Sequence, residues 1–245
     1  MQRIKCSEIW GGIKNADCDV CSAGITASLF SSACSGGKGG DAYYFSVCGS
    51  DKLTRLALAD VVGHGEQVSE ISGWVYDQLE SHMNDIDQPA MMAALNHRVA
   101  DRGYRAMTTA VIVSYYLNTG LVYFTYAGHP PMFSRSGSGR WRQQALPEAD
   151  GARNLPLGVS SDIPYDMGDA PLVKGDRLFL FSDGLVEAAG AGGEQFGADR
   201  LRAALDAAGD AGPMKLKTHV LDAVRNWTGG GLSHDDVTLI AIELQ

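Results

Sequence analysis

The chain has 245 residues, 45% of them hydrophobic and 20% charged, with a formal net charge of -9. This composition is typical of a globular protein that can bury a core. The acidic balance, without a run of Lys or Arg, argues against a nucleic-acid partner and against an anionic membrane surface. No apolar run approaches the roughly 18 residues of a membrane span, and the first residues lack the apolar stretch of a signal peptide. We therefore expect a cytoplasmic protein.

Residues 43–48 and 53–59 are β-prone and flank the turn-forming residues 49–52, which predicts a hairpin that ends at Asp60. Helical periodicity follows in residues 67–84, and a second helix is expected from Pro89 to Val99. Further strands are predicted at 107–117, 121–127, 177–182 and 237–244, and further helices at 201–208 and 216–227. Residues 1–36 are poorly assigned, apart from a candidate strand at Ile25–Phe30. This order of elements indicates an α+β fold in which two sheets pack face to face with helices outside.

Acidic residues lie at four predicted strand ends. Asp41 begins one strand, Asp60 and Asp183 each end one, and Asp235 and Asp236 begin the last. A carboxylate at such a boundary is costly to desolvate alone, and several together repel one another and raise their pKa values. A divalent cation such as Mg²⁺ or Mn²⁺ relieves both effects, and oxygen ligands suit it. The alternative at each position is a plain turn residue at a strand end, and spacing alone does not show that the four ends converge.

The five cysteines, all within the first fifth of the chain, are odd in number, which argues against a secreted disulfide framework. Cys18 and Cys21 have the spacing of a metal knuckle, but no second C-x-x-C follows. We favour reduced cysteines on or near strands, and the alternative is a small zinc site or redox pair.

A series of short motifs runs from about residue 37 to the C-terminus. They are Gly39–Asp41, Ala59–Gly65, Met107–Ala110, Tyr126–Pro131, Leu155–Val159, Gly175–Leu178, Ser182–Ala188, Glu194–Gly197 and Asp235–Leu239. Together and in this order they resemble the motifs of the SpoIIE/RsbU-like bacterial branch of the PPM (protein phosphatase 2C-like) superfamily. The resemblance implies a four-layer αββα sandwich of two antiparallel sheets flanked by helices. We expect one domain over residues 1–245, although residues 1–36 lie outside the motifs.

The resemblance also implies a metal-dependent protein serine/threonine phosphatase. Two divalent metal ions, Mn²⁺ or Mg²⁺, would activate a water molecule that attacks the phosphorus of phosphoserine or phosphothreonine. The implied metal ligands are Asp60, which would bridge both ions, the carbonyl of Val61, Asp183, Asp235, Asp41 as a ligand or a neighbour of the ligands, and Asp236 as the second candidate for the last carboxylate.

Other motif residues have two interpretations each. His64 is either a general acid or hydrogen-bond donor of the catalytic site, or part of a helix-entry turn. His129 is expected to shape a turn. Glu187 either anchors the segment after Asp183, which is thought to move on activation in this family, or has no such role. Thr108 and Thr109 either hydrogen-bond within the site or, as we favour, simply begin a strand.

Eukaryotic-type relatives grip the substrate phosphate with an early Arg, and this chain has no equivalent before Asp41. Lys38 is the candidate substitute for substrate binding, and the alternative is a solvated loop lysine. In this branch the substrate is often a phosphorylated STAS anti-anti-sigma factor, so the implied partner is a phosphorylated regulatory protein. An activator or a homodimer is a further expected partner, with the helix of residues 67–84 at the interface. The alternatives are a catalytically idle phosphoprotein-binding regulator and a different two-metal hydrolase, such as a nuclease.

Overall fold

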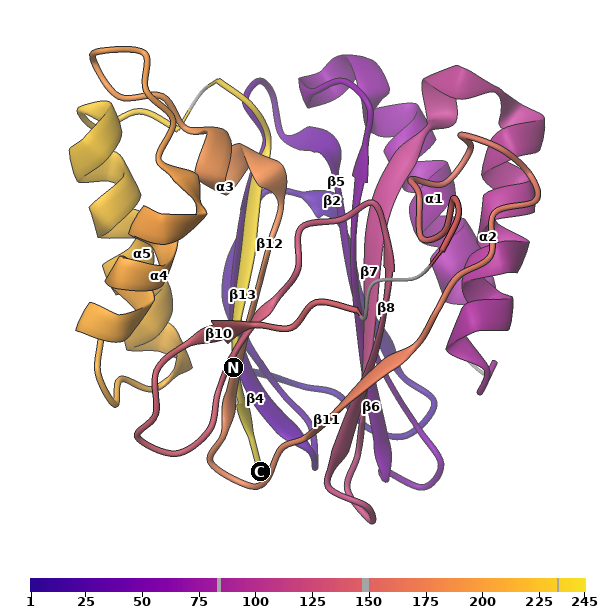
Figure 1. Ribbon diagram of the computed structural model, residues 1–245, viewed down its shortest axis with the longest axis horizontal. Coiled ribbons are helices and arrows are strands. Elements are labelled where there is room, and N and C mark those ends of the chain that lie inside the picture. Colours follow the sequence, from indigo (N-terminus) through magenta and orange to yellow (C-terminus); the bar gives the residue numbers. More distant parts are fainter. Residues whose placement is uncertain (83–84, 147–149, 233) are drawn as a thin grey trace.

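Two β-sheets lie face to face, and each carries helices on its outer surface (Figure 1). The computed structural model describes residues 1–82, 85–146, 150–232 and 234–245. Within these residues, one sheet has six strands in the spatial order β11 (Gly168–Pro171), β8 (Leu121–Ala127), β7 (Thr108–Tyr116), β6 (Leu53–Val61), β5 (Lys38–Cys48) and β2 (Ile9–Lys14). The other has seven, in the order β1 (Gln2–Arg3), β3 (Ala16–Cys21), β4 (Ile25–Ser32), β13 (Val237–Leu244), β12 (Arg177–Phe181), β9 (Phe133–Arg135) and β10 (Arg142–Gln143).

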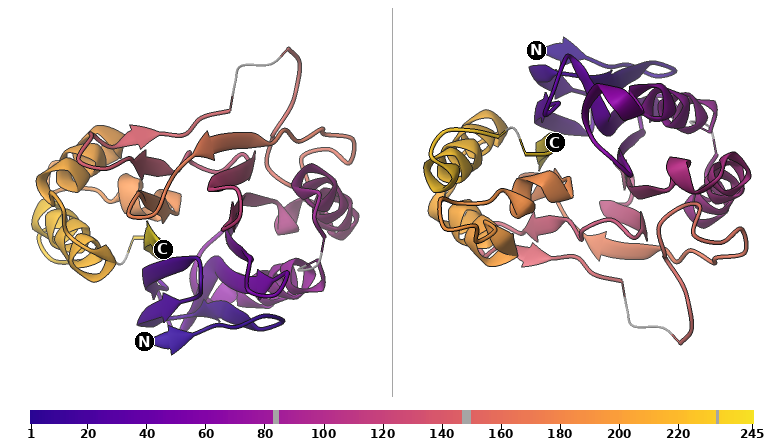
Figure 2. Two further views of the ribbon diagram at one scale, coloured as in Figure 1. Left: turned by 90° about the horizontal axis from the view of Figure 1, so that it is seen from below. Right: turned by 90° about the horizontal axis from the view of Figure 1, so that it is seen from above.

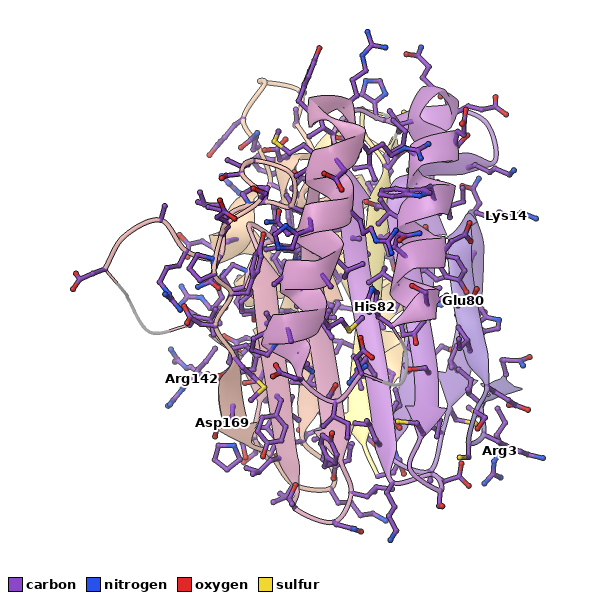
Figure 3. All side chains as sticks on the ribbon, turned by 90° about the vertical axis from the view of Figure 1, so that its right-hand side faces the viewer. Arg3, Lys14, Glu80, His82, Arg142 and Asp169 are labelled. Carbon is purple, nitrogen blue, oxygen red and sulfur yellow. The ribbon has the colours of Figure 1, made fainter. Side chains whose placement is uncertain are left out.

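The helices form the two outer layers, on opposite sides of the molecule (Figure 2). The six-stranded sheet is covered by α1 (Ser69–Ser81) and α2 (Gln88–Arg102), and the seven-stranded sheet by α4 (Gly197–Ala207) and α5 (Pro213–Thr228). Short helices are η1 (Gly65–Val68), η2 (Tyr104–Ala106) and α3 (Asp183–Glu187). Seen from the side of α1 and α2, Arg3 and Lys14 lie at one edge of the molecule, and Arg142 and Asp169 at the opposite edge (Figure 3).

Side-chain alternation along the central strands separates two cores. Tyr43 and Phe45 of β5 point into the core between the sheets, whereas Tyr44 packs beneath the α1 and α2 layer. Because successive residues of a strand point to opposite faces, the same alternation carries Asp41 towards the other sheet. In β6, Leu58 faces the inter-sheet core, and Asp60 shares its face.

The predicted α+β sandwich of four layers is confirmed, with one correction to its description as two antiparallel sheets. The short strand β1 pairs with β3 in parallel, Gln2 opposite Val20 and Arg3 opposite Cys21. The intervening strand β2 belongs to the other sheet. The chain therefore leaves the seven-stranded sheet after β1 and returns to it at β3. Because no hairpin connects β1 to β3, the two strands need not be antiparallel.

The element boundaries differ from the predictions in limited ways. The helix predicted at 67–84 begins as the 3₁₀ turn η1 and is α-helical over Ser69–Ser81, while residues 83–84 lie outside the described residues. Hydrophobic periodicity does not distinguish a 3₁₀ turn from the first turn of an α-helix. Helix α2 starts at Gln88, one residue before Pro89, because the Asp87 side chain accepts the backbone N–H of Ala90 at 3.0 Å. None of the helices in the described part of the chain is long and apolar enough to cross a membrane.

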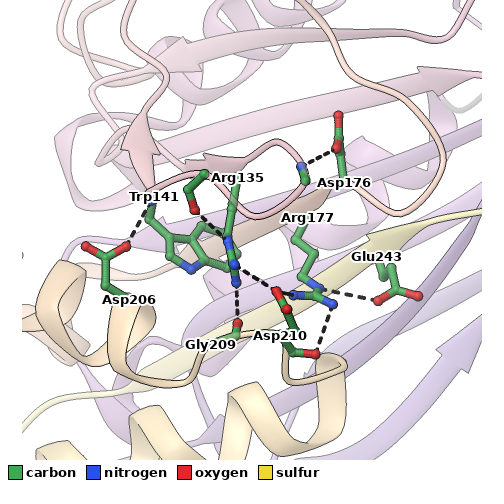
Figure 4. Close-up of polar contacts among 10 residues, drawn as sticks. Arg135, Trp141, Asp176, Arg177, Asp206, Gly209, Asp210 and Glu243 are labelled. Atoms are coloured by element: carbon green, nitrogen blue, oxygen red, sulfur yellow. Dashed lines mark hydrogen bonds and ion pairs between the residues drawn. The ribbon is translucent and has the colours of Figure 1, made fainter.

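A buried arginine ties the α4–α5 connection to the seven-stranded sheet (Figure 4). The guanidinium of Arg135 donates to the carbonyl oxygens of Gly139, at 2.7 Å, and of Gly209, and it pairs with Asp210 at 2.8 Å. The backbone carbonyl oxygen of Asp210 also accepts a hydrogen bond from the Arg177 guanidinium at 3.1 Å. The ends of α4 and α5 are thereby fixed over the strands that lead to α3.

Replacing Arg135 by Met should lower the free energy of unfolding by about 2–3 kcal/mol, because part-buried carbonyl groups lose a charged donor. Urea denaturation would measure the change. The matched control is Arg202→Met, because Arg202 pairs with Asp199 in an exposed contact and should change the stability by about 0.5 kcal/mol or less. Equal losses in the two variants would contradict a structural role for the Arg135 network.

Candidate metal centre

The ends of four strands meet at one edge of the sandwich, beside α3 in the upper part of Figure 1. Asp41 and Asp60 lie directly opposite each other in the antiparallel β5–β6 ladder. From the other sheet, the hydroxyl of Ser182, at the end of β12, donates to Asp41 Oδ2 at 2.8 Å. The same hydroxyl accepts the backbone N–H of Thr238 in β13 at 2.9 Å. Three of the acidic strand ends are therefore linked through one side chain.

The carboxyl groups at this edge influence one another strongly. Burial raises the pKa of Asp41 to about 7, and the charges of Asp236 and Asp183 act in the same direction. Burial also raises the pKa of Asp60 well above its usual range, together with the charges of Asp41 and Asp183 and a hydrogen bond with Asp183. Burial and the charge of Asp183 raise the pKa of Asp235. Asp41, Asp60, Asp183 and Asp235 therefore lie close enough together for their charges to interact.

Asp236 differs from the other four because both of its carboxylate oxygens accept backbone N–H groups. Its Oδ1 accepts from Cys34 at 2.8 Å, and its Oδ2 accepts from Gly40 at 2.5 Å and Gly65 at 2.8 Å. A Cβ atom on Gly39 would lie 2.7 Å from this carboxylate, so glycine is required for the close approach. Asp236 thus fastens the seven-stranded sheet to the turns at the ends of β5 and β6.

Asp183 and Asp235 lie on opposite sides of a tight contact between α3 and the start of β13. A Cβ atom on Gly184 would lie 2.1 Å from the carbonyl oxygen of Asp236 and 3.3 Å from the Cβ of Asp235. Only glycine allows this approach. The Oδ1 of Asp235 accepts the backbone N–H of Asp236 at 2.7 Å, which orients the Asp235 carboxyl group.

The donor set fits a divalent cation. Oδ1 of Asp41 is buried and has no hydrogen-bond partner within the described residues, although a buried carboxylate oxygen normally has one. Repelling carboxylates with raised pKa values are the environment that a hard cation neutralises. In the described part of the chain, no three His, Cys, Asp or Glu side chains already form a ready ligand group.

The remaining predicted site residues lie around this cluster. His64 is exposed just after β6, and its Nδ1 lies 3.1 Å from Cys34 Sγ. Val61 is the last residue of β6, and its carbonyl oxygen lies 3.0 Å from the position of a Cβ on Gly40. Lys38 is exposed at the start of β5 and pairs in register with Lys14. Strand alternation places Lys38 on the face of β5 opposite Asp41.

The other motif residues have mainly structural contacts. Thr108 begins β7, and its hydroxyl donates to Ala106 O at 2.7 Å, whereas Thr109 pairs with Asp60 in register. Glu187 is exposed at the end of α3. His129 is buried, with Nδ1 3.0 Å from Pro130 O, and Nε2 has no partner among the residues described. Burial lowers the pKa of His129 to about 4, against the opposing effects of Pro130 and the charge of Asp183.

The Cys18–Cys21 spacing does not form a metal knuckle. Both residues lie in β3, three positions apart, so their side chains leave the strand on opposite faces. Cys18 packs against the core between the sheets, and burial raises the pKa of its thiol. The cysteines are free, which agrees with the interpretation that we favoured.

Sequence reasoning missed the residues that connect the acidic strand ends. Ser182 and Cys34 carry no distinctive spacing, and their roles depend on contacts between segments separated by 141 and 202 residues. The available signal was the position of Ser182 beside Asp183 and of Cys34 just before the glycine-rich residues 36–40. That signal is compatible with many ordinary turn residues.

The architecture is that of PP2C-like phosphatase domains. The RsbU and RsbW domains of Rv1364c from Mycobacterium tuberculosis superpose with a TM-score of 0.78 at 21% identity, over 96% of this chain and 62% of that one. The phosphatase domain and regulatory fragment of SpoIIE from Bacillus subtilis superposes with a TM-score of 0.72 at 18% identity, over 98% of this chain and 64% of that one. These identities establish a shared fold.

Family membership comes from the sequence. The family model described as Stage II sporulation protein E matches residues 50–245, so the chain belongs to the SpoIIE family. Phosphoserine phosphatase RsbU of Bacillus subtilis is 31% identical over 153 residues, which are 60% of this chain and 43% of RsbU. The chain therefore lies in the SpoIIE/RsbU-like branch that the motifs indicated, and it spans less than half the length of that relative.

Metal should stabilise the protein more at pH 8 than at pH 5.5. In the metal-free protein, the raised pKa of Asp41 keeps the folded state protonated up to about pH 7. An unfolded Asp loses its proton near about pH 4, so stability falls as pH rises between these values. Mn²⁺ bound in place of the proton would add about 2.7 kcal/mol at 100 times its dissociation constant. Thermal unfolding with Mn²⁺ and with EDTA at both pH values measures the effect.

The matched variants are Asp41→Asn and Asp169→Asn, since Asp169 is exposed in β11. Asp41→Asn should raise the melting temperature of the metal-free protein at pH 8 and reduce the increment from Mn²⁺, and Asp169→Asn should do neither. Identical pH profiles for the two variants would contradict this account of the acidic edge.

Proposed function

We propose that this chain is a metal-dependent protein serine/threonine phosphatase that hydrolyses phosphoserine or phosphothreonine on a regulatory protein. The observation that supports it is the convergence of carboxyl groups with raised pKa values at one edge of a SpoIIE-family fold. Such a cluster serves phosphoryl chemistry because bound cations offset the charge of the phosphate that approaches it. The name of the relative RsbU, a phosphoserine phosphatase, agrees with this reaction.

Two Mn²⁺ or Mg²⁺ ions would supply a water of lowered pKa and would hold the phosphoryl oxygens. In this proposal Asp60, the carbonyl of Val61, Asp183, Asp235 and Asp41 hold the ions. Asp60 is the bridging candidate, because its carboxyl group is affected by Asp41 from the neighbouring strand and by Asp183 from the other sheet. Asp236 is not among the direct ligands that we propose, since both of its oxygens already hold backbone N–H groups.

We propose one domain over residues 1–245. Residues 1–36, outside the motifs, supply β2 to one sheet and β1, β3 and β4 to the other. Strand β4 pairs along its whole length with β13, from Ile25 opposite Leu244 to Ser32 opposite Val237. The amino-terminal segment is therefore part of the same cores.

Hydrolysis of p-nitrophenyl phosphate and of a phosphoserine peptide should require Mn²⁺ or Mg²⁺ and should stop in EDTA. Asp60→Asn should lower kcat about 1000-fold, because the loss of a bridging carboxylate removes several kcal/mol of charge stabilisation. Asp169→Asn, on the exposed edge strand β11, should retain activity. Metal binding by calorimetry without turnover on any substrate would favour instead the idle phosphoprotein-binding regulator, and preferential cleavage of phosphodiesters would favour a nuclease.

Lys38 is proposed as a contact for the substrate protein near this edge. Its side chain leaves β5 on the face opposite Asp41, which favours a contact outside the acidic cluster. In the same assay, Lys38→Ala should raise the KM for the phosphoserine peptide and leave the kinetics on p-nitrophenyl phosphate unchanged. An equal effect on both substrates would contradict this role.

The proposed substrate is a phosphorylated regulatory protein of a partner-switching system, such as a STAS anti-anti-sigma factor, with an activator or a second copy as regulator. Helix α1 was the predicted interface, but Val75 and Leu79 of its apolar face are buried in the core. The outer surface of α1, including the half-buried Trp74 beside Arg102, is what remains for a partner.

If α1 forms a homodimer, Trp74→Glu should convert the dimer to a monomer, because a charge at a packed interface is costly to desolvate. Size-exclusion chromatography with light scattering measures the mass of both proteins. A strictly monomeric wild-type chain, with and without substrate, would exclude the homodimer and leave an activator as the regulator.

A further inference from the structure

The helix that begins with Asp183 is too short to hold its own position. Helix α3 spans only Asp183–Glu187, and its N-cap residue Ser182 makes no side-chain capping bond. Instead, the Ser182 hydroxyl is used by Asp41 and Thr238. An isolated helix of one turn is unstable in water, so contacts with the rest of the protein must fix it.

Two contacts tie this turn to the start of β13. Gly184 packs directly on the backbone of Asp236. Beside it, the imidazole Nε2 of His234 lies 2.9 Å from the carbonyl oxygen of Gly184. Because a carbonyl oxygen only accepts, Nε2 carries the hydrogen and donates it. His234 directly precedes Asp235, so this hydrogen bond joins the segment of one acidic residue to that of the other.

We propose that His234 is a positioning residue that sets the placement of Asp183 relative to Asp235. The two carboxyl groups come from different strands, 52 positions apart in the chain, and a shared ion requires their spacing to be defined to a fraction of an ångström. The hydrogen bond from His234 to Gly184 joins the residue before Asp235 to the residue after Asp183. It fixes the first turn of α3 through its backbone, and therefore holds Asp183 without touching it.

The experiment compares His234→Gln with His234→Asn in the full chain. The amide nitrogen of Gln reaches the place of Nε2 and keeps a donor for Gly184 O, whereas that of Asn corresponds to Nδ1 and is too short. In metal-free protein, hydrogen exchange of the α3 amides should be about fivefold faster in His234→Asn than in wild type, as for the loss of one hydrogen bond. His234→Gln should lie within twofold of wild type.

The second measurement is the Mn²⁺ dissociation constant by calorimetry. It should rise about tenfold in His234→Asn, as is typical when a group that orients a metal ligand is lost, and should stay near wild type in His234→Gln. The control His219→Asn changes an exposed histidine of α5 and should alter neither quantity.

The exchange measurement does not depend on the proposed phosphatase activity, whereas the Mn²⁺ measurement rests on the proposed metal site. A wild-type protein that binds no Mn²⁺ would refute the proposed function and leave the exchange result to decide the role of His234. Unchanged exchange in His234→Asn, faster exchange throughout the β4–β13 pairing, or His234→Gln behaving like His234→Asn would each overturn the positioning role.

Discussion

The rest of the site depends on the repulsion among carboxyl groups that two sheets bring to one edge of an apolar core. Asp41 is 3% exposed and opposes Asp60 in the ladder, and Asp183 approaches from the other sheet. Without a counter-charge, this arrangement is tolerated only if protons are retained, which is what the raised pKa values mean. The fold thus holds a cluster of acidic residues whose mutual repulsion a bound divalent cation would relieve.

That repulsion must be resisted by contacts that are independent of the ion. Asp236 binds backbone groups at the ends of β5 and β6, and Ser182 joins β12 to Asp41. These bonds cross between the sheets, so the inter-sheet core and the acidic edge support each other. The Arg135 network acts further away, where it fixes the α4–α5 connection against the seven-stranded sheet. Strand ends therefore carry most of the site, whereas Asp183 begins the single-turn helix α3.

Much of this architecture was predictable, since β6, β7 and β13 are long strands with strong apolar character whose limits followed from alternation and turns, whereas β5 begins at Lys38, ahead of the predicted start at Tyr43. The strands β2 and β3 were not predicted. Glycine, charged and polar residues interrupt the apolar pattern of these strands, and both lie near sheet edges. The identity of the acidic residues was visible from the sequence. Their convergence was not, because it depends on pairings between distant segments that spacing does not encode.

The adjacent residues Asp235 and Asp236 show why motif position alone does not assign a role. Ile240 of β13 faces the other sheet, and Asp236, just before the strand begins at Val237, is oriented towards that sheet as well. Its carboxylate consequently meets the backbone of Gly40, where N–H groups are available. Asp235 leaves the chain on the other side, beside α3 and under the influence of Asp183. One neighbour thus joins the two sheets and the other lies beside Asp183, although the two side chains are chemically identical.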